Sequence, residues 1–180
     1  MHERRIPAQG TRGSRLQRHL VRSGSHHGVA ILARDVDPIE TRRNLPGDSA
    51  DREARYIEAA VNGVLIGCLY LPNGNPQPGP KFAYKLDWFQ RLIAYAGELK
   101  LSRAPVVLAG DYNVVPTDAD IYAMRSWRTN ALVQPEPRAA FARLVSSGAT
   151  EPQARARCHA GVRARLVSCT LPQSRRQLHA

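Results

Sequence analysis

An acidic residue and an amide residue end a short apolar run near the middle of the chain. Residues 106–109 are apolar and are followed by Gly110, Asp111 and, two residues later, Asn113. The run predicts a buried strand, in which Asp111 and Asn113 would lie on one face with Tyr112 turned away. A carboxylate can act as a general base or bind a hard cation, and a carboxamide can bind a phosphate or a water.

The same spacing fits a second interpretation. Asp and Asn commonly end strands because their side chains hydrogen-bond to nearby backbone, so the pair could form a plain turn. In α/β sheets, however, reactive groups gather where strands end, because the sheet holds the backbone rigid and the next loop exposes side chains. Gly110 would also let another group approach the backbone closely. The spacing alone leaves both interpretations open.

The segments that precede this pair predict strands. Residues 27–36, HGVAILARDV, form a compact apolar run typical of a buried strand. Residues 41–53 are polar and contain proline and glycine, which predicts a surface loop. The Asn-Gly pair at 62–63 can supply the positive φ angles of a type I′ turn, which predicts a hairpin with strands at 56–61 and 64–70.

A helix is predicted between this hairpin and the apolar run. After the Pro/Gly-rich residues 73–80, apolar residues recur at spacings of three and four. Further helices are expected at residues 118–124 and 139–145. The order of elements predicts an α/β fold, a mixed-sheet layered sandwich with helices packed on the sheet faces. The apolar positions of the first helix are Phe82, Leu86, Phe89, Ile93 and Ala96, widened by Trp88, Leu92, Tyr95 and Leu99.

Charge divides the chain into three parts. The net charge is +11, but residues 35–150 hold 13 basic and 13 acidic side chains and all the aromatic residues Phe, Trp and Tyr. We therefore expect a folded domain at residues 28–150 between basic, disordered segments at 1–27 and 151–180. These ends could bind phosphates by counterion release, or they could be solvated tails.

Length and cysteine usage limit the class of protein. The chain has 180 residues, enough for one domain with an apolar core. No stretch approaches the roughly 20 apolar residues of a membrane helix, and no signal-peptide core is visible. The three cysteines have no metal-like spacing, which argues against a disulfide framework. We expect a cytoplasmic monomer that does not enter a membrane.

The chain resembles the endonuclease/exonuclease/phosphatase superfamily, and within it the exonuclease III-like branch of apurinic/apyrimidinic (AP) endonucleases. The resemblance runs from Gly28 to near Gly148, and its most specific segment is LAGDYNVVPTD. The other segments that carry it, in chain order, are GVAILAR, RRNLPGD, LYLPNG and KFAYKLDWFQRL. It implies the superfamily's α/β sandwich and hydrolysis of phosphodiester bonds in double-stranded DNA, including DNA with abasic sites.

The resemblance also implies roles for individual residues. Asp111 is similar to the catalytic aspartate, which orients or deprotonates water or protonates the leaving group. Asn113 would bind the scissile phosphate near the metal. Tyr70 resembles the active-site tyrosine, although outside the family it would be interpreted as a core aromatic. Asn73 would present a polar side chain to the same pocket. The implied phosphate contacts, which could equally be solvated surface charges, are Arg42, Arg43 and Lys81.

The implied cofactor is Mg²⁺ or Mn²⁺, with Asp111 and Asn113 as ligands. Mg²⁺ and the amide and phenol donors would stabilise charge on the phosphoryl oxygens. A site with one aspartate supplies few protein ligands. It is nevertheless compatible with Mg²⁺ binding, because Mg²⁺ keeps several of its waters. Members of the superfamily that cleave phosphoinositides or sphingolipids match the KFAYKLDWFQ segment less well than the DNA-repair branch does.

Two features of the family have no counterpart in this sequence. The family begins with a segment that supplies an asparagine and a metal-binding glutamate, whereas the only acid among residues 1–27 is Glu3. It ends with an aspartate and an Asp-His pair, whereas no aspartate follows Gly148, and His159 and His179 lie in arginine-rich sequence. We therefore expect an incomplete fold, truncated or frameshifted at both ends, with family-like sequence in the other reading frames of the gene.

Three functions follow from these observations. The first is a DNA-repair nuclease that is weak or inactive in this chain. The second is a non-catalytic remnant of such a nuclease, and the third is a basic protein that binds nucleic acid through its tails. Metal-dependent cutting of abasic DNA that is lost on Asp111→Ala would favour the first. Binding without cutting would favour the third function. The absence of both binding and cutting would favour the second.

Overall fold

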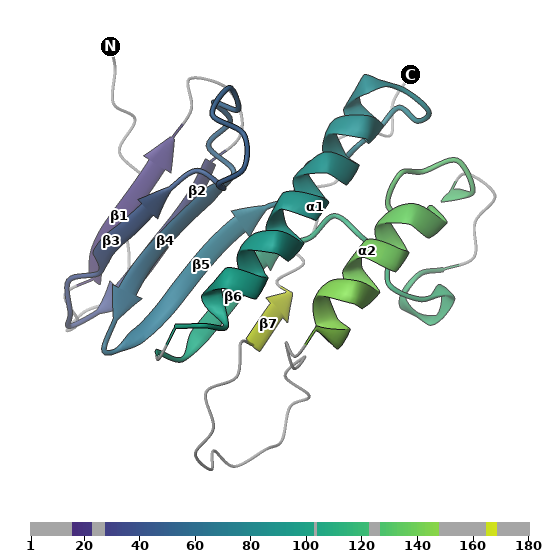
Figure 1. Cartoon of the computed structure of the whole chain (residues 1–180). Coiled ribbons are helices and arrows are strands. Elements are labelled where there is room, and N and C mark those ends of the chain that lie inside the picture. Colours follow the sequence, from purple (N-terminus) through teal and green to yellow (C-terminus); the bar gives the residue numbers. More distant parts are fainter. Residues whose placement is uncertain (1–15, 23–27, 103, 123–126, 148–164, 169–180) are drawn as a thin grey trace.

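The computed structural model describes residues 16–22, 28–102, 104–122, 127–147 and 165–168. These residues form two sheets and two α-helices, arranged in layers (Figure 1). The two-stranded sheet is formed by β1 (Leu16–Arg22) and β2 (Gly28–Arg34). The five-stranded sheet has the order β3 (Ile39–Arg43), β4 (Tyr56–Val61), β5 (Val64–Tyr70), β6 (Val106–Asp111) and β7 (Arg165–Ser168). The helices are α1 (Pro80–Leu99) and α2 (Pro135–Ser146), with a short 3-10 helix at Asp118–Asp120.

The larger sheet is mixed, as predicted. Strands β3, β4 and β5 are antiparallel neighbours, whereas β5, β6 and β7 run parallel. Parallel neighbours need a crossover connection, and α1 provides it between β5 and β6. The predicted α/β architecture with helices packed on a mixed sheet is therefore confirmed.

The predicted hairpin is confirmed at the residue level. Strands β4 and β5 have the expected bounds, and Asn62 and Gly63 between them have φ angles of 48° and 77°. Two positive φ angles match the right-handed twist of the flanking strands, which explains the Asn-Gly pair.

Some local predictions differ from the structure. Strand β3 occupies the start of the segment predicted as a loop, because pairing with β4 stabilises a polar edge strand. The helix expected at residues 118–124 is a 3-10 turn over Asp118–Asp120, and residues 123–126 lie outside the described part. Helix α2 begins four residues earlier than predicted, at Pro135, whose fixed φ suits the first helical position.

Two strands fall within the basic ends of the chain. β1 lies within residues 1–27, and β7 lies within residues 151–180. The remaining residues of both ends are outside the described part of the structure. The predicted domain boundaries at 28 and 150 therefore stay a prediction.

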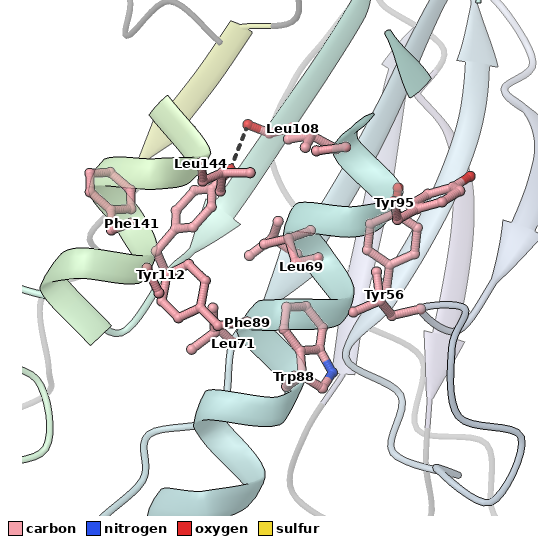
Figure 2. Packing of buried hydrophobic residues seen from close by; sticks show 14 of the residues in the cluster. Tyr56, Leu69, Leu71, Trp88, Phe89, Tyr95, Leu108, Tyr112, Phe141 and Leu144 are labelled. Carbon is pink, nitrogen blue, oxygen red and sulfur yellow. Dashed lines mark hydrogen bonds between the residues drawn. The ribbon is translucent and has the colours of Figure 1, made fainter. Parts of the chain in front are cut away.

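The main core lies between the five-stranded sheet and the two α-helices (Figure 2). Tyr112 packs edge-on against Phe141 of α2 at a centroid distance of 5.5 Å, and its hydroxyl donates to the Leu108 carbonyl at 3.1 Å. Tyr112 thus faces the core, as the alternation of β6 predicted. Burial raises the pKa of this phenol.

Helix α1 covers the sheet with a stripe that differs in part from the predicted one. Phe82, Leu86 and Ile93 are only half-buried. The fully or nearly fully buried residues of the helix are Lys85, Trp88, Phe89, Leu92, Tyr95, Ala96 and Leu99. A lysine therefore takes the first position of the buried face.

A second, smaller apolar cluster covers the opposite face of the sheet. Val29 and Ile31 of β2 pack with Ile57 and Ala59 of β4. Tyr70 lies at the edge of this cluster and is half-buried. Among the described residues, no helix has the length and apolar character needed to span a bilayer.

A buried carboxylate connects β4 to α1. Glu58 is 4% exposed and accepts hydrogen bonds from Thr41 Oγ1 at 2.7 Å, Tyr56 Oη at 3.0 Å and Tyr95 Oη at 2.8 Å. Arg42 Nε donates to the Tyr95 hydroxyl at 2.9 Å. Burial and then the hydrogen bond to Glu58 raise the pKa of Tyr95 to about 12.

This raised pKa predicts a loss of stability in alkali. In the unfolded chain Tyr95 ionises near its ordinary pKa of 10.0, whereas the fold holds the proton to about 12. The free energy of unfolding should therefore be intact below pH 10 and should fall between pH 10 and 12. Between pH 10 and 12, Tyr95→Phe should lose about 2 kcal/mol less of its free energy of unfolding than the wild-type chain does. The measurement is urea denaturation at several pH values.

Tyr122→Phe is the matched control, because Tyr122 is 90% exposed. It should leave the alkaline slope unchanged. An unchanged slope in Tyr95→Phe would contradict the prediction.

Candidate active site

The candidate site lies where the parallel strands β5 and β6 end side by side (Figure 1). Tyr70 is in register with Asp111, and the Leu71 N–H donates to the Asp111 carbonyl at 2.8 Å. Adjacent strands are about 4.8 Å apart, and residues in register share a face of the sheet. The register therefore places Tyr70 and Asp111 side by side on one face of the sheet, and both residues are half-buried.

Gly110 makes this close pairing possible. Its φ is 144°, and a Cβ at this position would lie 1.9 Å from the Leu69 carbonyl oxygen. The backbone that approaches Gly110 is thus that of β5. No other residue type fits here without moving the two strands.

Asn113 forms a turn that folds back onto the end of β5. It has a left-handed φ of 46°, and its N–H donates to Asp111 Oδ1 at 2.8 Å. Its side-chain Nδ2 donates to the Leu71 carbonyl at 2.7 Å, and only 5% of the residue is exposed. The turn suggested by the spacing is therefore present, and it is also what positions Asp111 and Asn113 relative to β5.

Asn73 joins this group from the loop after β5. Its Nδ2 donates to Asn113 Oδ1 at 3.3 Å, and its own Oδ1 accepts from Asn75 Nδ2 at 2.7 Å. Asn75 continues the network, since its Nδ2 donates to Asn130 Oδ1 at 3.1 Å and its Oδ1 accepts from the Ala131 N–H at 2.8 Å. Two loops far apart in sequence are thereby fixed at the site.

A buried lysine that the sequence pattern did not reveal lies beneath these residues. Lys85 of α1 is 0% exposed, and its Nζ donates to the carbonyls of Asn73, at 3.0 Å, and Asn113. Burial lowers its pKa to about 8, and the charge of Asp111 opposes this shift. The available signal was position, since Lys85 precedes the buried Trp88 by three residues and Phe89 by four.

An arginine directly before β4 also contacts the site and was not predicted. The Arg55 guanidinium lies 5.3 Å from the centroid of the Tyr70 ring, and its Nη1 is 3.5 Å from the Tyr70 carbonyl. Arg55 is 8% exposed. A buried cation against the ring face limits the rotation of the phenol and stabilises its position.

The three predicted basic contacts lie apart from this group. Arg42 and Arg43 are on β3, which β4 separates from β5. Arg42 donates to Tyr95, and Arg43 makes two 2.7 Å hydrogen bonds to the Glu40 carboxylate. Lys81 is exposed in the first turn of α1. Their roles as phosphate contacts stay predictions.

The oxygen atoms of the site suit a hard cation. Asp111 contributes a half-buried carboxylate, which accepts the Asn113 N–H, and Asn113 contributes an amide oxygen, which accepts from Asn73 Nδ2. No group of three or more His, Cys, Asp or Glu residues that could hold a metal occurs within the described ranges. One carboxylate and one amide oxygen are nevertheless compatible with Mg²⁺, which fills its remaining positions with water and substrate oxygens.

Comparison with known families identifies the family to which the chain belongs. The model of the endonuclease/exonuclease/phosphatase family matches residues 4–166, which include both strands and both loops of the site. The chain belongs to this family. The match extends beyond the 28–148 range on which the resemblance in the sequence was based.

Individual relatives within the family are nucleases and phosphatases. An exodeoxyribonuclease of Bacillus subtilis is 27% identical over 130 residues, which are 72% of this chain and 50% of the relative. Among solved structures, a 3′ phosphatase from Neisseria bound to a product DNA hairpin superposes with a TM-score of 0.67 at 32% identity, over 74% of this chain and 51% of that one. An AP endonuclease from Archaeoglobus fulgidus gives 0.65 at 26% identity, over 74% of this chain and 51% of that one.

These relatives identify the exonuclease III-like branch of the family. The chain spans about half the length of each of them. The family membership and the α/β fold are therefore established, whereas the activity, substrate and partners of the whole protein are matters of proposal.

Proposed function

We propose that this chain carries out metal-dependent hydrolysis of phosphodiester bonds in DNA, with weak activity, as an exonuclease III-like or AP endonuclease-like repair enzyme. The observation that carries the proposal is the register of Tyr70 with Asp111 at the ends of β5 and β6, beside Asn113. A phenol, a carboxylate and amides at one sheet edge match the needs of phosphodiester hydrolysis. The names of the relatives, which include an exodeoxyribonuclease and an AP endonuclease, support the same reaction.

Each side chain has a distinct task in the proposed reaction. The Asp111 carboxylate would accept a proton from the attacking water or orient it, with its own position fixed by the Asn113 N–H. The Tyr70 phenol would donate to a phosphoryl oxygen, held in place by Arg55. The half-buried Asn73 has a second Nδ2 hydrogen beyond the one donated to Asn113, and this hydrogen would bind the same phosphate.

Asp111 and Asn113 would hold a Mg²⁺ or Mn²⁺ ion. When bound, such an ion supplies positive charge that stabilises the phosphoryl oxygens and the leaving oxygen. The substrate proposed is double-stranded DNA with abasic sites, as suggested by the AP endonuclease and by the phosphatase bound to a DNA hairpin. We further propose a cytoplasmic location, on the basis of three cysteines without disulfide or metal spacing. The monomeric state stays a prediction.

A non-catalytic remnant of the nuclease is the second candidate. It is favoured by the single carboxylate of the site within the described residues. DNA binding through the basic tails is the third. Most of the arginines concerned lie outside the described residues.

The test is a cleavage assay on a labelled duplex that carries one abasic site, with the undamaged duplex of the same sequence as its control. We expect cleavage at the abasic site in Mg²⁺ and none after EDTA is added, with recovery when Mg²⁺ is restored. Binding of the duplex without cleavage would favour DNA binding through the basic tails as the function. A folded chain that neither cuts nor binds would favour the remnant.

A further inference from the structure

We propose that Lys85 is a positioning residue, whose buried ammonium group fixes Asn73 and Asn113 at the spacing that the phosphate site requires. The inference rests on the proposed function and goes beyond it by assigning a role to a side chain that would not itself touch the substrate.

The hydrogen bonds of Lys85 join two segments that are 40 residues apart in sequence. Its Nζ donates to the main-chain carbonyls of Asn73, which follows β5, and Asn113, which follows β6. The side chains of the same two residues are linked at 3.3 Å. One ammonium group therefore binds the backbone of both segments, and the side-chain amides of the same two residues bind each other.

The loop after β5 is built around this lysine. Gly74 has a φ of 89°, and a Cβ there would lie 2.6 Å from Lys85 Cδ and 3.2 Å from Ala131 Cβ. Any larger residue at Gly74 would push the lysine stem away from the two carbonyls. The loop conformation and the position of Lys85 thus depend on each other.

Stability alone does not account for a lysine at this position. Removing an ammonium group from water is costly, and Lys85 is fully buried on a helix face that is otherwise apolar. A methionine of similar length would avoid that cost. What methionine cannot supply is a donor to two carbonyl oxygens and a positive charge near Asp111.

The experiment compares Lys85→Met and Lys85→Gln in the full chain, with Lys100→Met as the matched control. Lys100 lies 15 residues later at the end of α1, about 22 Å along the helix axis. Circular dichroism and thermal unfolding establish that each variant is folded. The two readouts are steady-state cleavage of the abasic duplex and the side-chain amide resonances of Asn73 and Asn113 in ¹⁵N-resolved NMR spectra.

We expect Lys85→Met to shift both amide resonances and to lower kcat at least about 10-fold with KM changed less than about threefold, since a 1 Å misplacement can cost about 100-fold. Lys85→Gln should give intermediate amide shifts, because its amide can donate to one of the two carbonyls. Lys100→Met should leave both readouts at the wild-type values. Unmoved amide resonances in a folded Lys85→Met, or an unchanged kcat, would overturn the proposal.

Two further outcomes remain decisive. Should Lys85→Met not fold, Lys85→Gln carries the test, and wild-type amide resonances in that variant would count against the proposal. Should the wild-type chain cut no DNA, the proposed nuclease function fails by itself. The NMR comparison would then still show whether Lys85 positions the two asparagines.

Discussion

Asp111→Asn is expected to lower metal-dependent cleavage of abasic DNA by at least about 100-fold, since a positioned general base contributes about 10²–10⁴-fold. Asparagine has the shape of aspartate, and its side-chain oxygen can still accept the Asn113 N–H that Asp111 Oδ1 now accepts at 2.8 Å. The turn should therefore persist while the negative charge and the proton acceptor are lost. The measurement is kcat/KM on the abasic duplex, together with the free energy of unfolding.

Asp118→Asn provides the matched control for this substitution. Asp118 begins the 3-10 helix that follows the loop, and its side chain is 92% exposed in an ion pair with Arg138 at 2.8 Å. An exposed pair of this kind contributes little to stability, and Asp118 has no contact with the site residues. Cleavage by Asp118→Asn should stay at the wild-type rate. If Asp111→Asn also kept its rate within about threefold, the assignment of Asp111 as the base would be wrong.

Gly110→Ala is expected to be the most destabilising single substitution in β6. The left-handed φ of 144° is unfavourable for any residue with a Cβ, and the added atom would lie 1.9 Å from the Leu69 carbonyl oxygen. Relief requires β5 and β6 to separate at the point where Tyr70 and Asp111 meet. We expect the free energy of unfolding to fall by at least about 3 kcal/mol, measured by urea denaturation, and the variant to lose the site geometry with it.

Gly97→Ala makes the same chemical change at a position where it should raise the free energy of unfolding. Gly97 lies in α1, and a Cβ there meets no atom within 4 Å. Alanine in a helix interior is favoured over glycine by about 0.5–1 kcal/mol, so the free energy of unfolding should rise by about that amount. Equal effects of the two substitutions would show that the close contact at Gly110 does not limit stability.

The part of the fold that the sequence predicted is the part that local patterns encode. The hairpin of β4 and β5 follows from an Asn-Gly turn between two apolar runs, and β6 from an apolar run that ends in Gly110 and Asp111. Helix α1 follows from its three-and-four spacing. Each of these signals lies within one stretch of chain, and nothing distant is needed to produce it.

The resemblance to a nuclease family directed attention to Asp111, Asn113, Tyr70 and Asn73, and the structure brings these four together. Spacing alone could not decide between a turn and a site at Asp111. The structure shows that the turn exists and that it places the site residues. The sequence did not predict that Asn113 would be 5% exposed, because its burial depends on a hydrogen bond to Leu71, 42 residues away.

Tertiary structure alone decided the rest. β3 is polar and becomes a strand only by pairing with β4, and Arg42 on it turns toward Tyr95 of α1. Lys85 resembles a surface lysine in sequence, but it is buried because two carbonyls from distant loops satisfy its ammonium group. A charged residue can occupy a core when partners from elsewhere in the chain replace its water. The sequence by itself therefore determined β2, β4, β5, β6, the first helix and the candidate base, whereas only the assembled fold determined β3 and the polar groups that support that base.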